Sequence, residues 1–308
     1  MDGILNINKP QGKTSFSIVS LVKRLSGERR AGHAGTLDPA ATGVLPVCLG
    51  QATRISEFIM EDSKVYRAGI ELGVTTDTYD ADGTVISRQH PAGLGVTDLE
   101  AALSVFLGTT HQVPPMYSAV KHRGKPLYKW ARDGVTIERR SRPVDIYNLE
   151  LVEWQPPVAT IEVVCGKGTY IRSLAHDLGQ ALGCGAHLKS LVRSRYGIFD
   201  IKDALSIAQL EDAFQYGYWQ QYLYPIDAVL WRWAAIVVND DVSEDIRNGR
   251  SLLLNDQDVI ERSNPEQDIE DKALSTGRCR VYAPDGSFLA VLRFDAEKGH
   301  WHPEKVFQ

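Results

Sequence analysis

Three glycines and one proline interrupt the segment between residues 28 and 43. Gly32, Gly35, Pro39 and Gly43 all stand in this segment. Proline removes a backbone donor, and glycine weakens both helices and strands, so the segment is expected to be an irregular loop. Its glycines allow the backbone to approach a ligand closely. The loop holds the carboxylate of Asp38, which the following proline biases toward extended backbone. From the residues alone, Asp38 is either a reactive carboxylate or an ordinary turn residue.

Strand and helix periodicities flank this loop. Alternating apolar residues predict half-buried strands, and apolar residues three or four positions apart predict helices. Thr97 and Glu100 have the spacing of a capping box at the start of a helix. The predicted elements are a strand at 4–7, a helix from Ser15 that stops at Gly27, a strand at 66–72, a helix from 97 to 108, a short helix within 125–133, a strand at 160–165 and a helix at 171–182.

The residue pattern and the charge of the chain change near residue 235. Beyond it, short β-branched segments flank a Pro284-Asp285-Gly286 turn, which is a hairpin signal. Residues 236–308 carry 15 acidic and 9 basic residues, whereas residues 1–235 carry 24 and 25. We therefore predict two domains, residues 1–234 and 235–308. The acidic segment 255–272 is expected to be a flexible loop.

A basic segment interrupts the first domain. Residues 117–143 contain 8 basic and 2 acidic side chains, although the whole chain has a net charge of −5. Phosphate contact needs a local basic patch, not a basic whole chain. Charge alone leaves open a solvated surface loop.

No residue pattern predicts a cofactor or a metal. Gly166-x-Gly168 lacks the third glycine of a dinucleotide fingerprint, and His176 and His187 lack metal-ligand spacing. The four cysteines are scattered, which is typical of buried thiols in a reducing compartment. We expect a cytoplasmic protein with no membrane segment.

Two further residues have unusual positions. Arg172 lies in the first turn of a predicted helix, where the helix dipole disfavours a cation, so it needs either an anionic partner or solvent. Tyr66 begins an apolar strand face and is either a functional aromatic or a core residue.

Six motifs in order resemble the TruB family of tRNA pseudouridine synthases. The most specific is GHAGTLDPAATGVLP at 32–46, which looks like the catalytic motif of that family. The others are KPQGKTS at 9–15, KVY at 64–66, TDTYDADG at 76–83, PPMYSAVK at 114–121 with ARDG at 131–134, and KGTYIR at 167–172 with GCGAHL at 183–188.

The resemblance implies an α+β pseudouridine synthase fold. Its sheet would be mixed and largely antiparallel, with an inserted RNA-gripping segment at about 110–143 and a small C-terminal PUA-like β domain. The implied activity is the isomerisation of uridine 55 in the T-loop of tRNA to pseudouridine. The tRNA T-arm would be the partner, with no cofactor, no metal, no guide RNA and no membrane, and the protein is expected to be a monomer.

The resemblance also implies a role for each matching residue. Asp38 would be the nucleophile, Tyr66 would stack on the flipped base and serve as a base, and Arg172 would pair with Asp38. His33 would hold the target nucleotide out of its loop, and Tyr170 and Leu191 would line the base pocket. RNA contacts are expected from Lys9, Lys64, Lys121, Lys125, Lys129 and Arg132.

Three other functions stay open at this point. The chain could be an RNA-folding helper, a dyskerin-like synthase that needs a guide RNA, or an aspartate-based glycosidase. The last would require a second carboxylate facing Asp38.

Overall fold

The structure is a computed structural model that describes residues 1–91, 93–254, 256–262 and 277–307. The acidic segment predicted as a flexible loop, 255–272, lies largely outside these residues. Its described part is not a loop, because it forms the short helix η5 (Asp256–Asp258) and strand β16 (Val259–Arg262).

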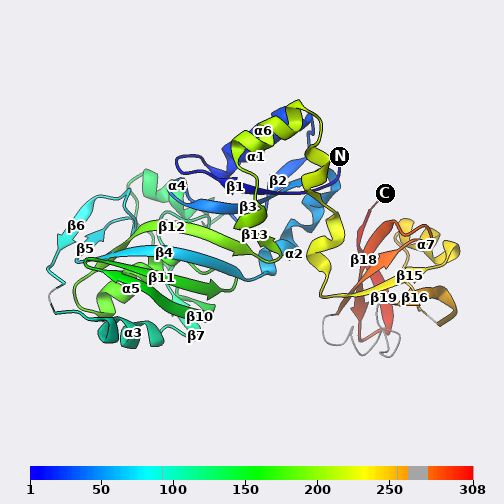
Figure 1. Ribbon diagram of the computed structural model, residues 1–308. Coiled ribbons are helices and arrows are strands. Elements are labelled where there is room, and N and C mark those ends of the chain that lie inside the picture. The colour runs from blue at the N-terminus through cyan, green and yellow to red at the C-terminus, as the bar shows by residue number, and fades with distance from the viewer. Residues whose placement is uncertain (92, 255, 263–276, 308) are drawn as a thin grey trace.

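A mixed sheet forms the body of the first part of the chain (Figure 1). Its strand order is β14-β1-β3-β12-β4-β11-β10-β7, with β2 beside β3 and β13 beside β12. Strands β3 and β12 pair in parallel, and the other neighbours are antiparallel. The strands are β1 (Gly3–Lys9), β2 (Ala31–His33), β3 (Thr42–Leu49), β4 (Lys64–Leu72), β7 (Gly108–Gln112), β10 (Arg142–Gln155), β11 (Val158–Cys165), β12 (Ala186–Tyr196), β13 (Phe199–Asp200) and β14 (Leu223–Tyr224).

Apolar helix faces cover this sheet in two places. Helices α3 (Val96–Ser104) and α5 (Ile171–Ala181) pack on β4, β10, β11 and β12, and α1 (Ser15–Ser26) and α6 (Ile207–Gln215) pack on β1 and β3. Alternation on β4 explains the first contact, because Tyr66, Ala68, Ile70 and Leu72 all face one core. The shorter helices η1 (Gly50–Ile55), α2 (Ser56–Glu61), η2 (Ile201–Asp203), η3 (Trp219–Tyr222) and η4 (Ile226–Leu230) connect these elements.

Two small hairpins extend from the body. One is β5 (Val74–Thr76) with β6 (Val85–Arg88). The other is β8 (Lys121–His122) with β9 (Lys125–Pro126), followed by helix α4 (Leu127–Arg132). The basic segment therefore has its own short elements between β7 and β10, and α4 fulfils the prediction of a short helix there.

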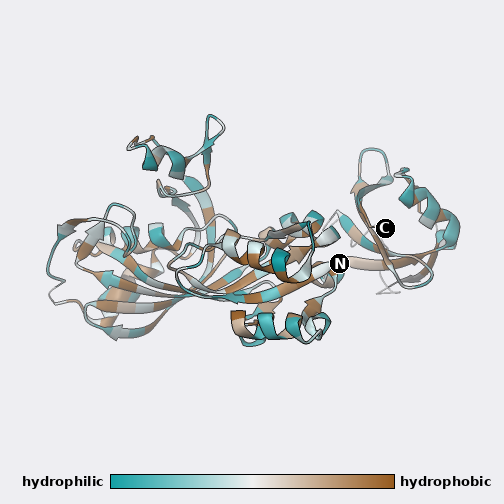
Figure 2. Ribbon diagram, turned by 90° about the horizontal axis from the view of Figure 1, so that it is seen from above, coloured by the Kyte–Doolittle hydropathy of each residue, from teal (hydrophilic) through white to brown (hydrophobic). Residues whose placement is uncertain are grey.

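The C-terminal part is a small β domain. Its sheet order is β16-β15-β17-β18-β19, with helix α7 (Asp240–Arg247) packed against it. The other strands are β15 (Ala234–Val238), β17 (Arg278–Tyr282), β18 (Phe288–Asp295) and β19 (His300–Val306). Seen from above, this domain stands at one end of the molecule (Figure 2).

The α+β fold with a small C-terminal β domain is thus confirmed, but two further local predictions are wrong. The segment 28–43 is not wholly irregular, because β2 pairs with the end of β3. Helix α3 starts at Val96 with Gly95 as its N-cap, two residues earlier than a capping box at Thr97 predicts, and it ends at Ser104 and not at 108. The Asp98 carboxylate, not Glu100, accepts the hydrogen bond at its start, from the Gly95 backbone at 2.8 Å. No helix of the described ranges is long and apolar enough to cross a membrane.

Candidate active site

The N-terminal segment fixes the backbone around Asp38. The hydroxyl of Ser15, 2% exposed, accepts from the Leu37 N–H at 2.9 Å and donates to the Leu37 carbonyl at 3.0 Å. On the other side of Asp38, the Gly12 N–H donates to the Pro39 carbonyl at 2.8 Å. Both neighbours of the carboxylate are therefore held, while its own side chain keeps 42% of its surface exposed.

Arg172 reaches this carboxylate from the first turn of α5. Its Nη2 lies 3.0 Å from Oδ2 of Asp38, and Nη1 lies 3.6 Å from Oδ2 of Asp80. Nη2 also donates to the Tyr117 carbonyl at 2.8 Å. The Arg172 side chain is only 7% exposed, so these groups take the place of water. The anion that the helix position requires is therefore present, and Asp38 and Asp80 share one guanidinium.

Asp80 is a site residue that the sequence analysis did not single out. Its Oδ1 accepts from the Thr78 hydroxyl at 2.5 Å and from the Asp82 N–H at 3.2 Å. These contacts orient the other oxygen toward Arg172. The signal was available, because Asp80 belongs to the TDTYDADG motif.

The pKa of Asp38 is raised, although its ion pair with Arg172 alone would lower it. Removal from water raises its pKa above the ordinary value, Arg172 lowers it, and Asp80 raises it again. The direction is upward, so the arginine offsets only part of the cost of burial. The ionised carboxylate is consequently more basic than a free aspartate.

Tyr66 and Leu191 lie on adjacent strands. Tyr66 is opposite Arg193, and Ala68 is opposite Leu191, in the antiparallel pairing of β4 with β12. Tyr66 is 8% exposed and belongs to the same core as Leu37, with Leu191 packed against it. An aromatic ring and an aliphatic side chain thus lie beside the loop that carries Asp38.

Burial raises the pKa of Tyr66, and the charge of Arg193 opposes that rise. The phenol is therefore protonated at neutral pH. A stacking role needs no ionisation, whereas a base role requires the phenol to lose its proton first.

Tyr170 and His33 border the same region. Tyr170 directly precedes α5, and its N–H donates to the Gln112 side chain at 2.8 Å. His33 ends β2 and is half-buried. Burial and the Arg193 charge lower its pKa, so the imidazole is neutral at pH 7. Its Nδ1 has no hydrogen-bond partner among the described residues.

The lysines expected to bind RNA fall into two groups. Lys121, Lys129 and the arginine Arg132 are exposed on the hairpin β8–β9 and α4. Lys125 forms an ion pair with Asp133, and its ammonium lies 4.2 Å from the Trp130 ring centre.

Lys9 and Lys64 do not fit an RNA-contacting role. Lys9 is 0% exposed and donates to the carbonyls of Pro10, Lys13 and Pro39, and Lys64 is 7% exposed and donates to those of Met60 and Asp62. Burial lowers the pKa of each to about 8. The sequence shows where a lysine stands but not whether its side chain points into the protein or into solvent. We therefore interpret Lys9 and Lys64 as residues that stabilise the fold by donating to backbone carbonyls.

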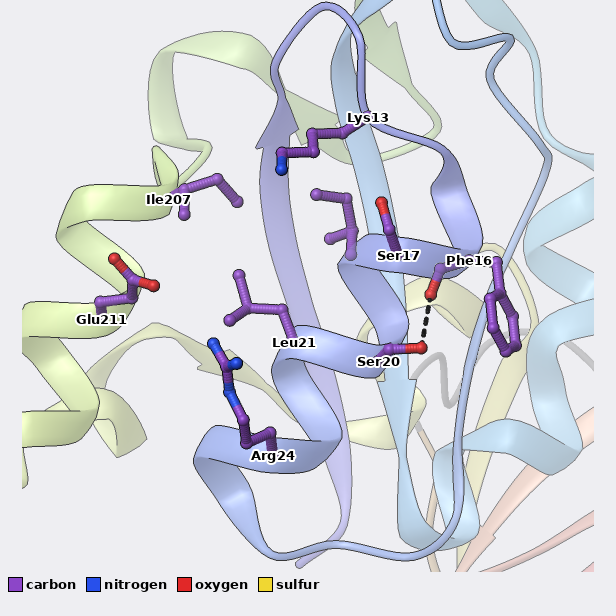
Figure 3. Close-up of a pocket in the computed structure, with 9 residues that line it drawn as sticks. Lys13, Phe16, Ser17, Ser20, Leu21, Arg24, Ile207 and Glu211 are labelled. Atoms are coloured by element: carbon purple, nitrogen blue, oxygen red, sulfur yellow. Dashed lines mark hydrogen bonds between the residues drawn. The ribbon is translucent and has the colours of Figure 1, made fainter.

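A groove between α1 and α6 lies apart from these residues (Figure 3). Phe16, Leu21 and Ile207 give it apolar walls, and Arg24 and Glu211 approach from opposite helices. None of the predicted site residues lines it. All four cysteines are buried and free, as expected. Within the described ranges, no cluster of three His, Cys, Asp or Glu side chains could hold a metal.

Comparison with known proteins decides the family. A model of the TruB family pseudouridylate synthase (N terminal domain) matches residues 23–171, and one of the tRNA pseudouridylate synthase B C-terminal domain matches 172–230. The tRNA pseudouridine synthase B of Dehalococcoides mccartyi (strain ATCC BAA-2266) is 43% identical over 307 residues, which is 100% of this chain and 97% of that protein. This chain belongs to the TruB family. The Syntrophotalea carbinolica member is 49% identical over 211 residues, 68% of this chain and 69% of that protein.

Solved structures agree on the fold. A chain of a Cbf5-Nop10-Gar1 complex superposes with a TM-score of 0.74 at 24% identity, covering 99% of this TruB-family chain and 85% of that one. A chain of an H/ACA RNP bound to a substrate RNA containing 2'-deoxyuridine gives a TM-score of 0.72 at 22% identity, covering 99% and 85%. These likenesses extend over the C-terminal β domain and concern architecture alone.

Proposed function

We propose that this chain converts uridine 55 in the T-loop of tRNA to pseudouridine, with Asp38 as nucleophile and without cofactor or guide RNA. The observation that carries the proposal is the Arg172–Asp38 ion pair beside Tyr66, in a chain of the TruB family. The similar proteins named tRNA pseudouridine synthase B support tRNA as the substrate.

The reaction needs a positioned carboxylate more than any other group. The C1′–N1 bond breaks, the uracil turns over, and C5 bonds to C1′; C5 then loses its proton and N1 gains one. Asp38 attacks the ribose as the C1′–N1 bond breaks, and it is displaced when C5 bonds to C1′, which returns the free carboxylate; the attack requires its ionised form. The raised basicity strengthens the nucleophile, and Arg172 favours the charged state over the neutral acid.

The base pocket must hold a detached uracil. Extruding the uridine from a folded loop costs about a few kcal/mol. Stacking on Tyr66 returns roughly 1–3 kcal/mol, on the scale of aromatic platforms for single strands. Leu191 and Tyr170 supply further apolar surface. His33 is neutral, so it can support the displaced nucleotide without repelling the nearby Arg193 guanidinium.

The exposed basic residues of 117–143 would grip the RNA backbone. Lys121, Lys129 and Arg132 can contact T-arm phosphates independently of sequence. The C-terminal domain, which we expect to be PUA-like, has a net charge of −6 over residues 236–308. We therefore assign most phosphate contacts to the catalytic part.

The test is pseudouridine formation on an unmodified tRNA transcript without added RNA. The unaltered chain should modify position 55, and a transcript with cytidine at that position should yield none. Asp38→Asn should abolish the product, whereas Asp203→Asn, an exposed aspartate outside the site, should leave it unchanged. Full activity of Asp38→Asn would refute the nucleophile, and a strict need for a guide RNA would refute the tRNA assignment.

A further inference from the structure

Arg193 is a fully buried cation without a carboxylate partner in the described part of the chain. Its side chain is 1% exposed and is among the largest of the fully buried side chains. The ion pairs recorded between described residues do not include it. Burying an uncompensated guanidinium costs several kcal/mol, so its position requires a compensating function.

The guanidinium binds the catalytic loop directly. Nε donates to the Val44 carbonyl at 2.8 Å, and Nη2 donates to the Gly35 carbonyl at 3.0 Å. Gly35 lies three residues before Asp38, and Val44 lies six residues after it. One side chain therefore holds the chain on both sides of the carboxylate.

The backbone of Arg193 reinforces this contact. Arg193 is paired with Gly43 where β12 and β3 run parallel. Gly43 has φ +103°, and a Cβ placed on it would lie 2.3 Å from the Arg193 carbonyl oxygen. Only glycine allows this close approach of the two backbones. The loop that carries Asp38 therefore rejoins the sheet beside Arg193.

The same residue is also the strand partner of Tyr66. The two residues are directly opposite each other on β12 and β4, and the nearby charge of Arg193 lowers the pKa of the Tyr66 phenol against the rise that burial causes. The Arg193 Cζ lies 4.7 Å from the Tyr196 ring centre, a cation–π contact that limits the movement of the guanidinium.

The neighbouring groups make the charge costly. Arg193 contributes to lowering the pKa of Lys9, Lys64 and His33. Two of these groups, Lys9 and Lys64, are themselves cations at neutral pH, and the groups that Arg193 stabilises are the carbonyls of Gly35 and Val44 in the loop.

We propose that Arg193 is a positioning residue that locks the Asp38 loop to Tyr66, so that nucleophile and stacking ring act on one nucleotide from fixed positions. This rests on the proposed function. A displacement of about 1 Å between such groups can lower the rate about 100-fold.

The experiment compares Arg193→Met and Arg193→Lys with the control Arg195→Met in the full chain. Arg195 lies on the same strand but is 60% exposed. With a T-arm hairpin RNA, Arg193→Met should lower kcat about 100-fold with KM changed less than about threefold. Arg193→Lys keeps the charge but loses the forked guanidinium, so its kcat should lie between that of Arg193→Met and that of the unaltered chain. Arg195→Met should keep the kcat of the unaltered chain.

A double-mutant cycle with Tyr66→Phe separates positioning from general destabilisation. If Arg193 acts through the phenol, single-turnover rates should show Arg193→Lys costing about tenfold less in the Tyr66→Phe background. Independent effects, an effect on KM alone, or an unchanged kcat would overturn the proposal. Should Arg193→Met fail to fold, the Arg193→Lys cycle decides. An unaltered chain that makes no pseudouridine would instead refute the proposed function, and this inference with it.

Discussion

Asp80→Asn tests whether the shared guanidinium controls the charge of Asp38. Asp80 raises the pKa of Asp38, so neutralising it should lower that pKa. Because protonation of the nucleophile stops the reaction, the acidic limb of the pH–rate profile should move to lower pH. The substitution is nearly isosteric and leaves the Arg172–Asp38 pair in place.

The same change should lower kcat at neutral pH. At 3.6 Å, two unit charges attract by roughly 5 kcal/mol at an effective dielectric constant of about 20. Desolvation and screening reduce the net value, to below about 1 kcal/mol for exposed pairs. Arg172 and Asp80 are 7% and 18% exposed, so we expect Asp80→Asn to weaken the interaction that holds Arg172 in place by about 1–2 kcal/mol. If this loss appears in the transition state, kcat falls roughly tenfold.

The assay is single-turnover pseudouridine formation on a T-arm hairpin from pH 4 to pH 9. Asp77→Asn is the control, because Asp77 lies in the same loop but contacts the Thr84 N–H. An acidic limb that moves to higher pH, or does not move while kcat falls, would refute the electrostatic argument. Equal effects of both variants would point to loop disruption.

Three further predictions follow from single contacts. Ser15→Ala should lower the free energy of unfolding by about 1–3 kcal/mol in denaturant titration, because it leaves the Leu37 N–H and carbonyl unpaired, and it should lower kcat more than KM. Arg172→Met should abolish turnover while gel-shift binding of tRNA stays nearly intact; an equal loss of binding would make Arg172 a phosphate contact. Lys129→Ala should flatten the salt dependence of tRNA affinity more than Lys125→Ala, whose ammonium is already paired, and the reverse order would refute that ranking.

The sequence correctly predicted those elements that are stabilised by residues close together in the chain. Helix α1 begins after the Thr14 cap, whose side chain accepts from the Ser17 N–H, and ends at Gly27 in the left-handed conformation. Strand β2 was missed because its three residues are defined as a strand by their pairing with β3, a partner that no local pattern reveals.

The same reasoning applies to the active site. The helix dipole indicated that Arg172 needs an anion, but not that two carboxylates from different loops would share it. Lysine positions were the weakest prediction, because burial of Lys9 and Lys64 depends on backbone carbonyls that only the fold brings together. Arg193 had no sequence signal beyond its place after the GCGAHL motif.

The first sheet ends with β14 at Tyr224 and the second begins with β15 at Ala234, but the cores of the two parts are not separate. Phe307 and Val291, from the C-terminal domain, belong to a core cluster with Ile55 and Phe58 of the first part. Arg54 also lies 5.4 Å from the Phe307 ring centre. The two parts therefore share an apolar interface.

We expect this interface to couple the stabilities of the two parts. Phe307 is 5% exposed, and truncating a buried phenylalanine costs about 3–5 kcal/mol. Phe307→Ala should therefore lower the unfolding midpoint of the whole chain as one transition, as followed by calorimetry, while Tyr216→Ala, which removes an exposed ring, should not. Two separate transitions, with only one shifted, would show that the parts fold independently and that the shared cluster contributes little. The outcome bears on the proposed function, because a C-terminal domain that packs on the first part would present its acidic surface at a fixed distance from the basic segment that we propose to bind RNA.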